Sequence, residues 1–280
     1  MQILRTRDEL QKFALETRLS GKTIGLVPTM GFLHEGHLSL IDIARSKADV
    51  VIVSIFVNPK QFGPNEDFDK YPRDFERDAA LCQEHGADVI FAPEIDSMYN
   101  NDSSVWVEET LLSRPLCGAS RPGFFRGVTT VVAKLFNLAL PNFAVFGLKD
   151  AQQLFVIRRM VRDLDFPLEI IAAPLVRGED GLALSSRNRY LSDDEHTRAL
   201  SIHKSLLQAK AKILESHDNL EEAINNAKAL VTAAGGRVDY ITALDSETME
   251  YPTAETKEIL LAAAVFFGTT RLIDNELFVW

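Results

Sequence analysis

Two histidines in the segment PTMGFLHEGH carry the clearest chemical signal in this 280-residue chain. His34 and His37 are three positions apart, at the point where an apolar strand is expected to end and a helix to begin. This spacing places both rings on one face of the helix. The unpaired N–H groups and partial positive charge of a helix start attract phosphate, and an imidazole that titrates near neutrality donates to phosphate oxygens. The pair therefore predicts a phosphate site.

Two other interpretations of these histidines stay open. They are consistent with an ordinary capping or surface pair, and with zinc binding. However, the spacing HEGH is one residue shorter than the zinc motif HExxH, and no third ligand is obvious. The segment is also not the dinucleotide-binding motif GxGxxG, because the bulky residues Phe32 and Leu33 follow Gly31.

Polar residues follow two further expected strands. In the segment FVNPKQFG, Pro59 and Gly63 end the strand, and we expect Gln61 to point into a cleft. In FGLKDAQQ, Lys149 is suited to offset phosphate charge, and Asp150 is the expected N-cap of a helix. For each segment the alternative is an ordinary polar loop.

A fourth polar segment is LSSRN, where two hydroxyls precede Arg187 and suit an oxyanion. Its alternative is a polar turn. In open α/β sheets ligands bind outside the carboxyl ends of the strands. We therefore expect the four segments to converge on one site.

The elements that must position these residues follow an alternating pattern over the first two-thirds of the chain. Helices are predicted at 7–19, 35–46, 74–85, 128–140 and 151–164, and strands at 24–28, 50–57, 88–92, 143–146 and 168–176. The strand at 50–57 has no charged residue, as expected for a strand covered on both faces. Strands that alternate with helices predict a Rossmann-like, doubly wound parallel sheet.

The pattern changes near residue 177. Ser192 and Glu195 form a capping-box signal before a long helix predicted at 192–216. A second helix is predicted at 220–234, followed by antiparallel strands at 239–244, 259–267 and 271–279. We therefore expect an α/β fold with two domains, a Rossmann-like domain at 1–177 and a smaller α+β domain at 178–280.

Composition and charge narrow the class of protein. The chain is 46% hydrophobic and 25% charged, with a net charge of −10, which disfavours nucleic acid and anionic lipid as partners. The longest nearly apolar run, 259–268, is about half the length that a bilayer requires. No signal peptide is recognisable, and two cysteines do not make a disulfide framework. We expect a cytoplasmic protein whose Cys82 and Cys117 are buried.

Taken together, the segments closely resemble the pantothenate synthetase (pantoate–β-alanine ligase) family of the HxGH nucleotidylyltransferase superfamily. The resemblance runs from PTMGFLHEGH through FVNPKQF, FRGVTTVVAKLFN and FGLKDAQQL to LSSRNRYL. HxGH alone marks the superfamily, whereas the combination marks this ligase. The resemblance implies that ATP, with Mg²⁺, joins pantoate to β-alanine through a pantoyl-adenylate. It also implies a homodimer.

The resemblance further implies site residues. His34, His37, Lys149 and Arg187 would be catalytic. The ATP site would comprise Met30, Gly31, Phe32, Leu33, His34, Glu35, Gly36, His37, Gly147, Leu148, Lys149, Asp150, Val176, Leu184, Ser185, Ser186 and Arg187. The substrate site would comprise Gln61, Gln153, Pro28 and Asn58, with Gln61 and Gln153 on pantoate. No Mg²⁺ ligand is assigned.

Three positions depart from the family pattern. Lys60 and Leu184 stand where Met is common, and Phe124 stands where His is common. These departures concern the detail of the pocket rather than the reaction. Two other functions stay open, a nucleotidyl transfer to a phosphorylated acceptor and a non-catalytic nucleotide sensor. The first usually carries an SSTxxR-type signature, whereas this chain has SSRN.

The reaction needs shielding from water, because the adenylate hydrolyses readily. The segment 63–74 is a candidate lid, and so is the domain at 178–280.

Overall fold

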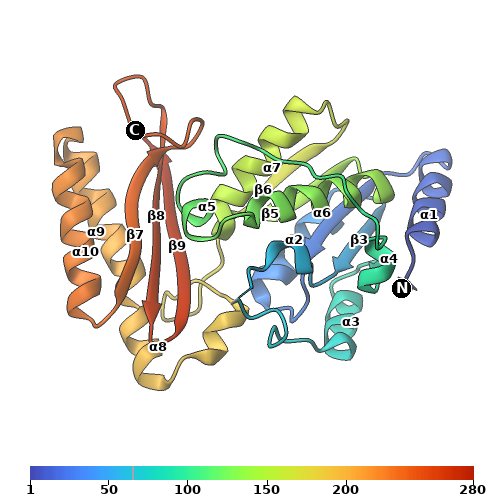
Figure 1. Cartoon of the computed structure of the whole chain (residues 1–280), viewed down its shortest axis with the longest axis horizontal. Coiled ribbons are helices and arrows are strands. Elements are labelled where there is room, and N and C mark those ends of the chain that lie inside the picture. The colour runs from blue at the N-terminus through green and yellow to red at the C-terminus, as the bar shows by residue number, and fades with distance from the viewer. Residues whose placement is uncertain (65) are drawn as a thin grey trace. The chain divides into compact units, whose positions relative to one another are not determined.

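The computed structural model describes residues 1–64 and 66–280, and these form two compact units (Figure 1). Unit 1 comprises residues 1–148 and 152–174, and unit 2 comprises residues 149–151 and 175–280. Residues 149–151 therefore group with the C-terminal part of the chain, although they lie between two elements of unit 1 in the sequence.

Unit 1 contains a six-stranded sheet. Its strands lie in the order β1 (Gln2–Leu4), β4 (Val89–Phe91), β3 (Val50–Ile55), β2 (Ile24–Thr29), β5 (Phe143–Gly147) and β6 (Glu169–Ala173). Every neighbouring pair is parallel. The predicted parallel sheet is confirmed, with β1 as an additional edge strand of three residues.

Helices cover both faces of this sheet. On one face α2 (Glu35–Arg45) and α3 (Phe75–Glu84) bury alternate strand residues such as Val51, Val53 and Ile90. The intervening strand residues, which point to the opposite face, are also buried. On that face α1 (Arg7–Leu19) and α6 (Phe124–Ala139) pack against β2. Because successive strand residues point to opposite faces, a strand buried on both faces needs an unbroken apolar run. The sequence of β3 comes close to this, since Ser54 is its only polar residue.

Several short elements were not predicted. They are the helices α4 (Ile95–Met98) and α5 (Cys117–Ser120) and the single turns η1 (Pro59–Gln61), η2 (Leu148–Asp150) and η4 (His217–Asn219). Elements of three or four residues are too short to display a hydrophobic period. The longer predicted elements are present with shifted ends: α6 begins at Phe124, β6 ends at Ala173, and α7 runs over Ala151–Asp163.

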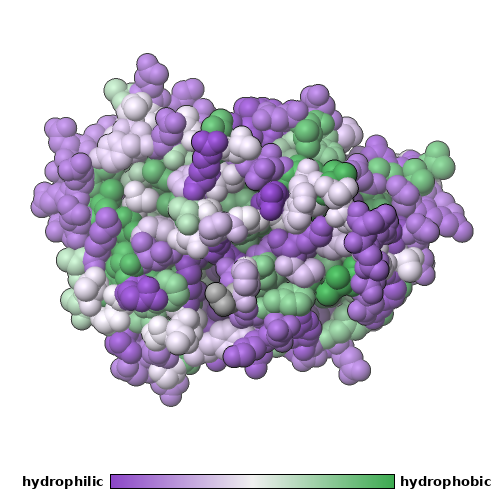
Figure 2. Space-filling model, viewed as in Figure 1, coloured by the Kyte–Doolittle hydropathy of each residue, from purple (hydrophilic) through white to green (hydrophobic). Residues whose placement is uncertain are grey.

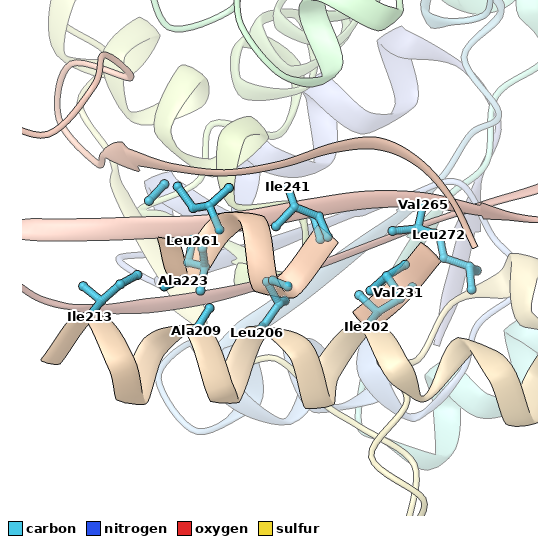
Figure 3. Close-up of a cluster of buried hydrophobic side chains, with 14 of the residues drawn as sticks. Ile202, Leu206, Ala209, Ile213, Ala223, Val231, Ile241, Leu261, Val265 and Leu272 are labelled. Carbon is cyan, nitrogen blue, oxygen red and sulfur yellow. The ribbon is translucent and has the colours of Figure 1, made fainter. Parts of the chain in front are cut away.

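Unit 2 is a three-stranded antiparallel sheet in the order β7 (Arg237–Asp245), β8 (Glu258–Phe267), β9 (Thr270–Val279). The helices α9 (Ser201–Glu215) and α10 (Leu220–Ala233) pack against the sheet. Figure 3 shows their apolar side chains, among them Ile202, Leu206 and Val231, directed towards Ile241, Leu261 and Val265 of the strands. The unit therefore has a hydrophobic core of its own.

One predicted element of unit 2 is wrong. The helix expected at 192–216 is two helices, α8 (Asp193–Ala199) and α9, which meet at Leu200. Leu200 keeps right-handed helical dihedrals, with φ −58° and ψ −21°, so the chain bends there without a loop. The predicted capping box is confirmed, since Ser192 accepts from the Glu195 N–H and the Glu195 carboxylate accepts from the Ser192 N–H.

The surface agrees with the composition. The face shown in Figure 2 is mainly hydrophilic, with hydrophobic residues in small separate groups. Across residues 1–64 and 66–280, no helix combines the length and the apolar character that crossing a bilayer requires. Cys82 and Cys117 are both buried and unbridged, as expected, and burial raises the pKa of the Cys82 thiol to about 12.

Candidate active site

The strand order defines where a ligand should bind in unit 1. From β2 the chain adds β3 and β4 on one side, and later adds β5 and β6 on the other. The boundary between β2 and β5 is thus the topological switch point, and ligands of open α/β sheets bind outside the carboxyl ends of the strands at this point. The segment that follows β2 carries both histidines.

The histidines occupy the start of α2 and contact each other. His34 is the N-cap and His37 is the third helical residue, with ring centroids 4.1 Å apart. The His34 N–H donates to His37 Nδ1 at 3.3 Å, and the Gly36 N–H donates to His34 Nδ1 at 3.2 Å. The capping interpretation of these residues is therefore confirmed, and it leaves a phosphate role open.

Capping determines the tautomer of each neutral ring. An Nδ1 atom that accepts a main-chain N–H carries no proton, so the proton of the neutral imidazole is on Nε2. Each ring then has an N–H donor at Nε2, on the side away from its cap. Two adjacent imidazole donors at the positive end of a helix suit an anion.

Asp78 of α3 shapes the loop in front of the histidines and was not predicted. Its side chain is buried, with 1% relative exposure, and it accepts from the Phe32 N–H at 2.6 Å and from the Leu33 N–H at 2.8 Å. Phe32 has φ +51°, a conformation that costs energy in a non-glycine residue. The two hydrogen bonds hold the loop in this conformation.

Gly31 completes this arrangement. Its φ is +82°, and a Cβ atom there would lie 3.0 Å from Asp78 Oδ2 and 3.0 Å from Ile55 Cγ2. Burial raises the pKa of the Asp78 carboxyl, while the Phe32 and Leu33 N–H groups act in the opposite direction. A signal for Asp78 existed in the sequence, because Phe75, Asp78, Ala79 and Cys82 follow the i, i+3, i+4, i+7 spacing of a buried helix face.

Gln61 is oriented by its neighbours. Its Oε1 accepts from Asn58 Nδ2 at 3.1 Å, and its Nε2 donates to Met30 Sδ at 3.0 Å. The side chain is 8% exposed, and its orientation towards a cleft stays a prediction. Pairing of Pro28 with Ser54 and of Thr29 with Ile55 brings the segments after β2 and β3 together, which explains the Met30–Gln61 contact.

Asn58 is buried and holds Gln61 in place. Its Oδ1 accepts from the Tyr99 hydroxyl at 2.9 Å and the Lys60 N–H at 3.3 Å, and its second Nδ2 hydrogen bond goes to the Gly127 carbonyl at 3.1 Å. Burial raises the pKa of Tyr99, which keeps its hydroxyl protonated as a donor. Gly127 lets α6 approach this segment closely, because a Cβ there would overlap the Lys60 carbonyl.

The two adjacent glutamines of α7 differ in environment. Gln152 is buried, and its amide accepts from the Cys117 N–H and donates to the carbonyls of Leu112 and Pro115. It therefore fixes the loop before α5. Gln153 is only half-buried. The three hydrogen bonds of Gln152 indicate a structural role. The partial exposure of Gln153 is consistent with the predicted contact to a ligand.

The predicted site residues of unit 2 form a second set, whereas Gly147 and Leu148 lie in unit 1. The Leu184 N–H donates to the Val176 carbonyl at 3.1 Å, which brings the two predicted ATP-binding segments together. Ser185 caps the turn η3 (Ser186–Tyr190) by accepting from the Arg187 N–H at 3.2 Å. Lys149 and Asp150 belong to the same unit, with 3.8 Å between their charged groups.

The candidate lid segment 63–74 includes residue 65, which lies outside the described residues. In the described part, the Glu66 carboxylate accepts two hydrogen bonds of 2.6 Å from Arg121, and Arg121 also donates to the Gln61 carbonyl at 3.3 Å. Phe62 packs edge-on against Phe68 and Tyr71. An ion pair and an aromatic cluster thus connect this segment to the residues around Gln61.

Side chains of the kinds that bind metal ions do not gather around the two histidines. Within the described parts of the chain, 1–64 and 66–280, no group of three histidine, cysteine, aspartate or glutamate side chains is arranged to bind a metal. The zinc interpretation of the two histidines is therefore not supported.

Comparison with known proteins identifies the family. The sequence model described as pantoate-beta-alanine ligase matches residues 2–277. The chain is 51% identical over 275 residues to a pantothenate synthetase of Thermosipho africanus, covering 98% of this chain and 99% of the relative. It is also 51% identical over 276 residues to a pantothenate synthetase of Geobacter sulfurreducens, covering 98% of each.

Solved structures agree with this match. The pantothenate synthetase from Thermus thermophilus has a TM-score of 0.92 and 44% identity, with 99% of each chain covered. The pantoate-beta-alanine ligase of Francisella tularensis, solved with Beta-gamma ATP and beta-alanine, has a TM-score of 0.80 and 36% identity, covering 99% of this chain and 97% of that one. Because the match extends from one end of the chain to the other, the chain belongs to the pantoate–β-alanine ligase family.

Proposed function

We propose that this chain catalyses the ATP-dependent condensation of pantoate with β-alanine, giving pantothenate, AMP and diphosphate through a pantoyl-adenylate. The observation that carries the proposal is the pair of capped histidines at the switch point, in a chain that its family model matches over residues 2–277. Gln61 contacts Met30 of the loop that precedes these histidines. The relative from Francisella tularensis was solved with the nucleotide and with β-alanine, which supports these two substrates.

In the first half-reaction a pantoate carboxylate attacks the α-phosphate of ATP. Two anions must meet, so positive charge and hydrogen-bond donors have to stabilise the transition state. We assign this work to His34 and His37, whose Nε2 donors lie at the start of α2, and to Lys149 and Arg187 of unit 2. The pyrophosphate leaves with the negative charge that these groups stabilise.

The remaining nucleotide contacts follow from the same assignment. The loop Met30–Leu33 and the first turn of α2, with Glu35 and Gly36, lie in unit 1 with Gly147 and Leu148. Unit 2 contributes Asp150, Val176 and the residues Leu184–Ser186. We propose that 1–177 is the nucleotide- and pantoate-binding domain and that 178–280 is a lid domain, with residues 63–74 as a second lid.

Gln61 and Gln153 are proposed to bind the pantoate, within the substrate site that includes Pro28 and Asn58. Asn58 orients the Gln61 amide, whose second Nε2 hydrogen is then suited to donate to a substrate oxygen. A neutral amide orients the nucleophilic carboxylate with less ground-state stabilisation than an arginine would give. Replacing Gln153 with arginine is therefore expected to slow adenylation. Faster pantoate-dependent exchange of pyrophosphate into ATP by that variant would contradict this idea.

In the second half-reaction the amine of β-alanine attacks the acyl carbon of the adenylate, and AMP leaves. AMP is a good leaving group, so the step does not require a strong base. The nitrogen loses its proton as the amide forms.

Mg²⁺ enters this proposal together with the nucleotide. Mg²⁺ commonly binds substrate phosphates and water with only one or two protein carboxylates. Such binding does not require a cluster of three metal-binding side chains, and none occurs among the described residues. Bound there, Mg²⁺ would reduce the negative charge of the phosphates.

The proposal also includes a homodimer and a cytoplasmic location. Sedimentation equilibrium of the purified protein tests the homodimer. The expected result is a mass that rises with protein concentration towards twice that of one chain. Fractionation of the source cells tests the cytoplasmic location.

The decisive experiment is exchange of radioactive pyrophosphate into ATP by the purified protein, with and without pantoate. Exchange that requires pantoate, followed by pantothenate formation when β-alanine is added, is the expected result. Exchange that requires a phosphorylated acceptor instead would indicate a different HxGH activity. Nucleotide binding without exchange under any condition would indicate a sensor, and either result would refute the proposed function.

A further inference from the structure

Strand β9 contacts every segment of unit 2 that carries a predicted ATP-binding residue. The first contact is to Lys149. Asn275 of β9 is buried, with 7% relative exposure, and its Nδ2 donates to the Lys149 main-chain carbonyl at 3.0 Å. The two residues are 126 positions apart in the chain. The bond therefore connects β9 to the short segment between β5 and α7.

The second contact is to the segment 176–184. Asp274, next to Asn275, is 4% exposed, and it accepts two hydrogen bonds from Arg177, at 2.7 and 2.9 Å. Arg177 also donates to the Gly181 carbonyl at 3.2 Å and forms a β-bridge with Ala183. Asp274 thereby fixes the hairpin that holds Val176 and Leu184 together.

These two contacts are coupled, and a third joins them. The Asn275 N–H donates to Asp274 Oδ1 at 2.8 Å, so the carboxylate that binds Arg177 also binds the main chain of Asn275. The turn η3, whose first residues are Ser186 and Arg187, contacts β9 as well. Two segments that are distant in sequence are therefore bonded to the successive residues Asp274 and Asn275, and a third segment contacts the same strand.

We propose that Asn275 is a positioning residue for the adenylation step, acting through the main chain of Lys149. The proposal rests on the proposed function, in which Lys149 stabilises charge on the phosphates. A lysine side chain is long and has many rotamers, so the position of its ammonium group depends on the placement of its main chain. The Asn275 bond supplies that placement, and its loss also leaves the Lys149 carbonyl without this donor.

The test is a double-mutant cycle on Asn275→Ala and Lys149→Ala, with pantoate-dependent pyrophosphate exchange as the measurement. Small displacements of a catalytic group cost up to about a hundredfold in rate. We expect Asn275→Ala to lower kcat about 10- to 100-fold, with KM for ATP changed less than about threefold, as for a group that acts in the transition state. In the Lys149→Ala background, Asn275→Ala should have no further effect on kcat.

A control variant separates positioning from stability. Ser246 is a buried residue of the same unit, and its hydroxyl donates to Glu258. Ser246→Ala should lower the thermal unfolding temperature as Asn275→Ala does, while kcat remains that of the unmodified chain. If Asn275→Ala does not fold, Asn275→Leu keeps the volume and removes the donor, and it is then tested in the same cycle.

Each remaining outcome overturns the inference. Multiplicative losses in the double variant would show that Asn275 acts independently of Lys149. Full activity of Asn275→Ala would show that the bond is dispensable, and equal loss in Ser246→Ala would show a general effect of stability. Failure of the proposed function is distinguishable from all of these, because the unmodified chain would then show no pantoate-dependent exchange.

Discussion

The two sets of predicted site residues are held by different means. The histidines of unit 1 are placed by hydrogen bonds that span two or three residues at the start of α2. In unit 2, the Lys149 carbonyl is bonded from 126 positions away, and Arg177 is bonded to a carboxylate 97 positions away.

This difference determines how each set responds to change. A cap is a local structure, because the residues that form it are neighbours in the sequence. A bond across a hundred residues exists only after strand β9 has been placed by the core of its unit. We therefore expect substitutions near the histidines to act on chemistry first, and substitutions along β9 to affect geometry and stability together.

The largest effect is expected for His37→Ala. The variant removes an imidazole donor and should lower the rate of the first half-reaction by about two to four orders of magnitude, since one preorganised donor is worth that much. Loss of the ring also removes an acceptor at the helix start, at a cost of about 1 kcal/mol.

The measurement is pantoate-dependent pyrophosphate exchange, with circular dichroism to verify folding. His85→Ala is the matched control, because His85 of the same unit pairs with Asp42 at 2.7 Å and is not a site residue. A rate for His37→Ala close to that of the control would remove His37 from the mechanism.

Asp78→Ala should have the next largest effect. It tests whether the site residues of unit 1 are positioned only by hydrogen bonds between sequence neighbours. The Phe32 and Leu33 N–H groups would lose their acceptor, which is expected to destabilise the fold by about 2 to 4 kcal/mol. The loop before His34 would relax, and kcat should decrease about 10- to 100-fold.

Thr6→Ala is the control in the same unit, since the Thr6 side chain caps α1 by accepting from the Glu9 N–H. It should cost about 1 kcal/mol in urea unfolding and leave kcat unchanged. If both variants reduce activity in proportion to stability, Asp78 has no specific effect on the loop.

A smaller effect is expected for Arg177→Lys, which examines the hairpin of unit 2. Lysine retains the charge but not the paired geometry of two hydrogen bonds with Asp274. Unfolding free energy should decrease by about 1 to 3 kcal/mol, and KM for ATP should rise severalfold if Val176 and Leu184 bind the nucleotide.

Arg271→Lys provides the comparison on strand β9, which also carries Asp274. Arg271 donates through two nitrogens to Asp239, at 3.0 and 2.8 Å. We expect a similar or smaller change in stability and no change in KM for ATP. An equal rise of KM in the two variants would argue against a specific role for the 176–184 hairpin.

The smallest effect concerns acid stability in unit 2. The His196 side chain and the Leu182 N–H lower the pKa of Asp180 by hydrogen bonding. A carboxyl with a lowered pKa stabilises the folded state above its ordinary pKa, and this contribution is lost as pH falls through the lowered value. Asp180→Asn should therefore reduce stability at neutral pH and flatten its decline in acid. Urea unfolding midpoints measured between about pH 3 and 7 test this, and an unchanged pH dependence would contradict it.

Much of the fold could be predicted because its signals are periodic. The uncharged run of β3 and the amphipathic helices on both sides indicated a parallel sheet. The strand order, which makes the β2–β5 boundary the expected binding position, came only from the structure. The division of the predicted helix at Leu200 was missed, because no glycine or proline marks it in the sequence.

Within the site, local residues were easier to predict than their supports. His34 and His37 were identified from spacing, whereas Asp78 was overlooked, although it occupies an apolar helix face. Two consecutive buried polar residues, Asp274 and Asn275, interrupt the alternation expected of β9. In the sequence, the signal for their contacts was an adjacent polar pair within a predicted strand.

The sequence by itself determined the order of the elements, the caps at the start of the helices and the chemical types of the residues that follow each strand. These properties depend on neighbours within a few positions, where hydrophobic period and hydrogen-bonding capacity are encoded directly. Only the tertiary structure decided that Asp78 holds the loop at Phe32 and that Asn275 holds Lys149. Such bonds join residues whose proximity results from packing of the whole unit, because burial of apolar surface places the strands before any single polar pair can form.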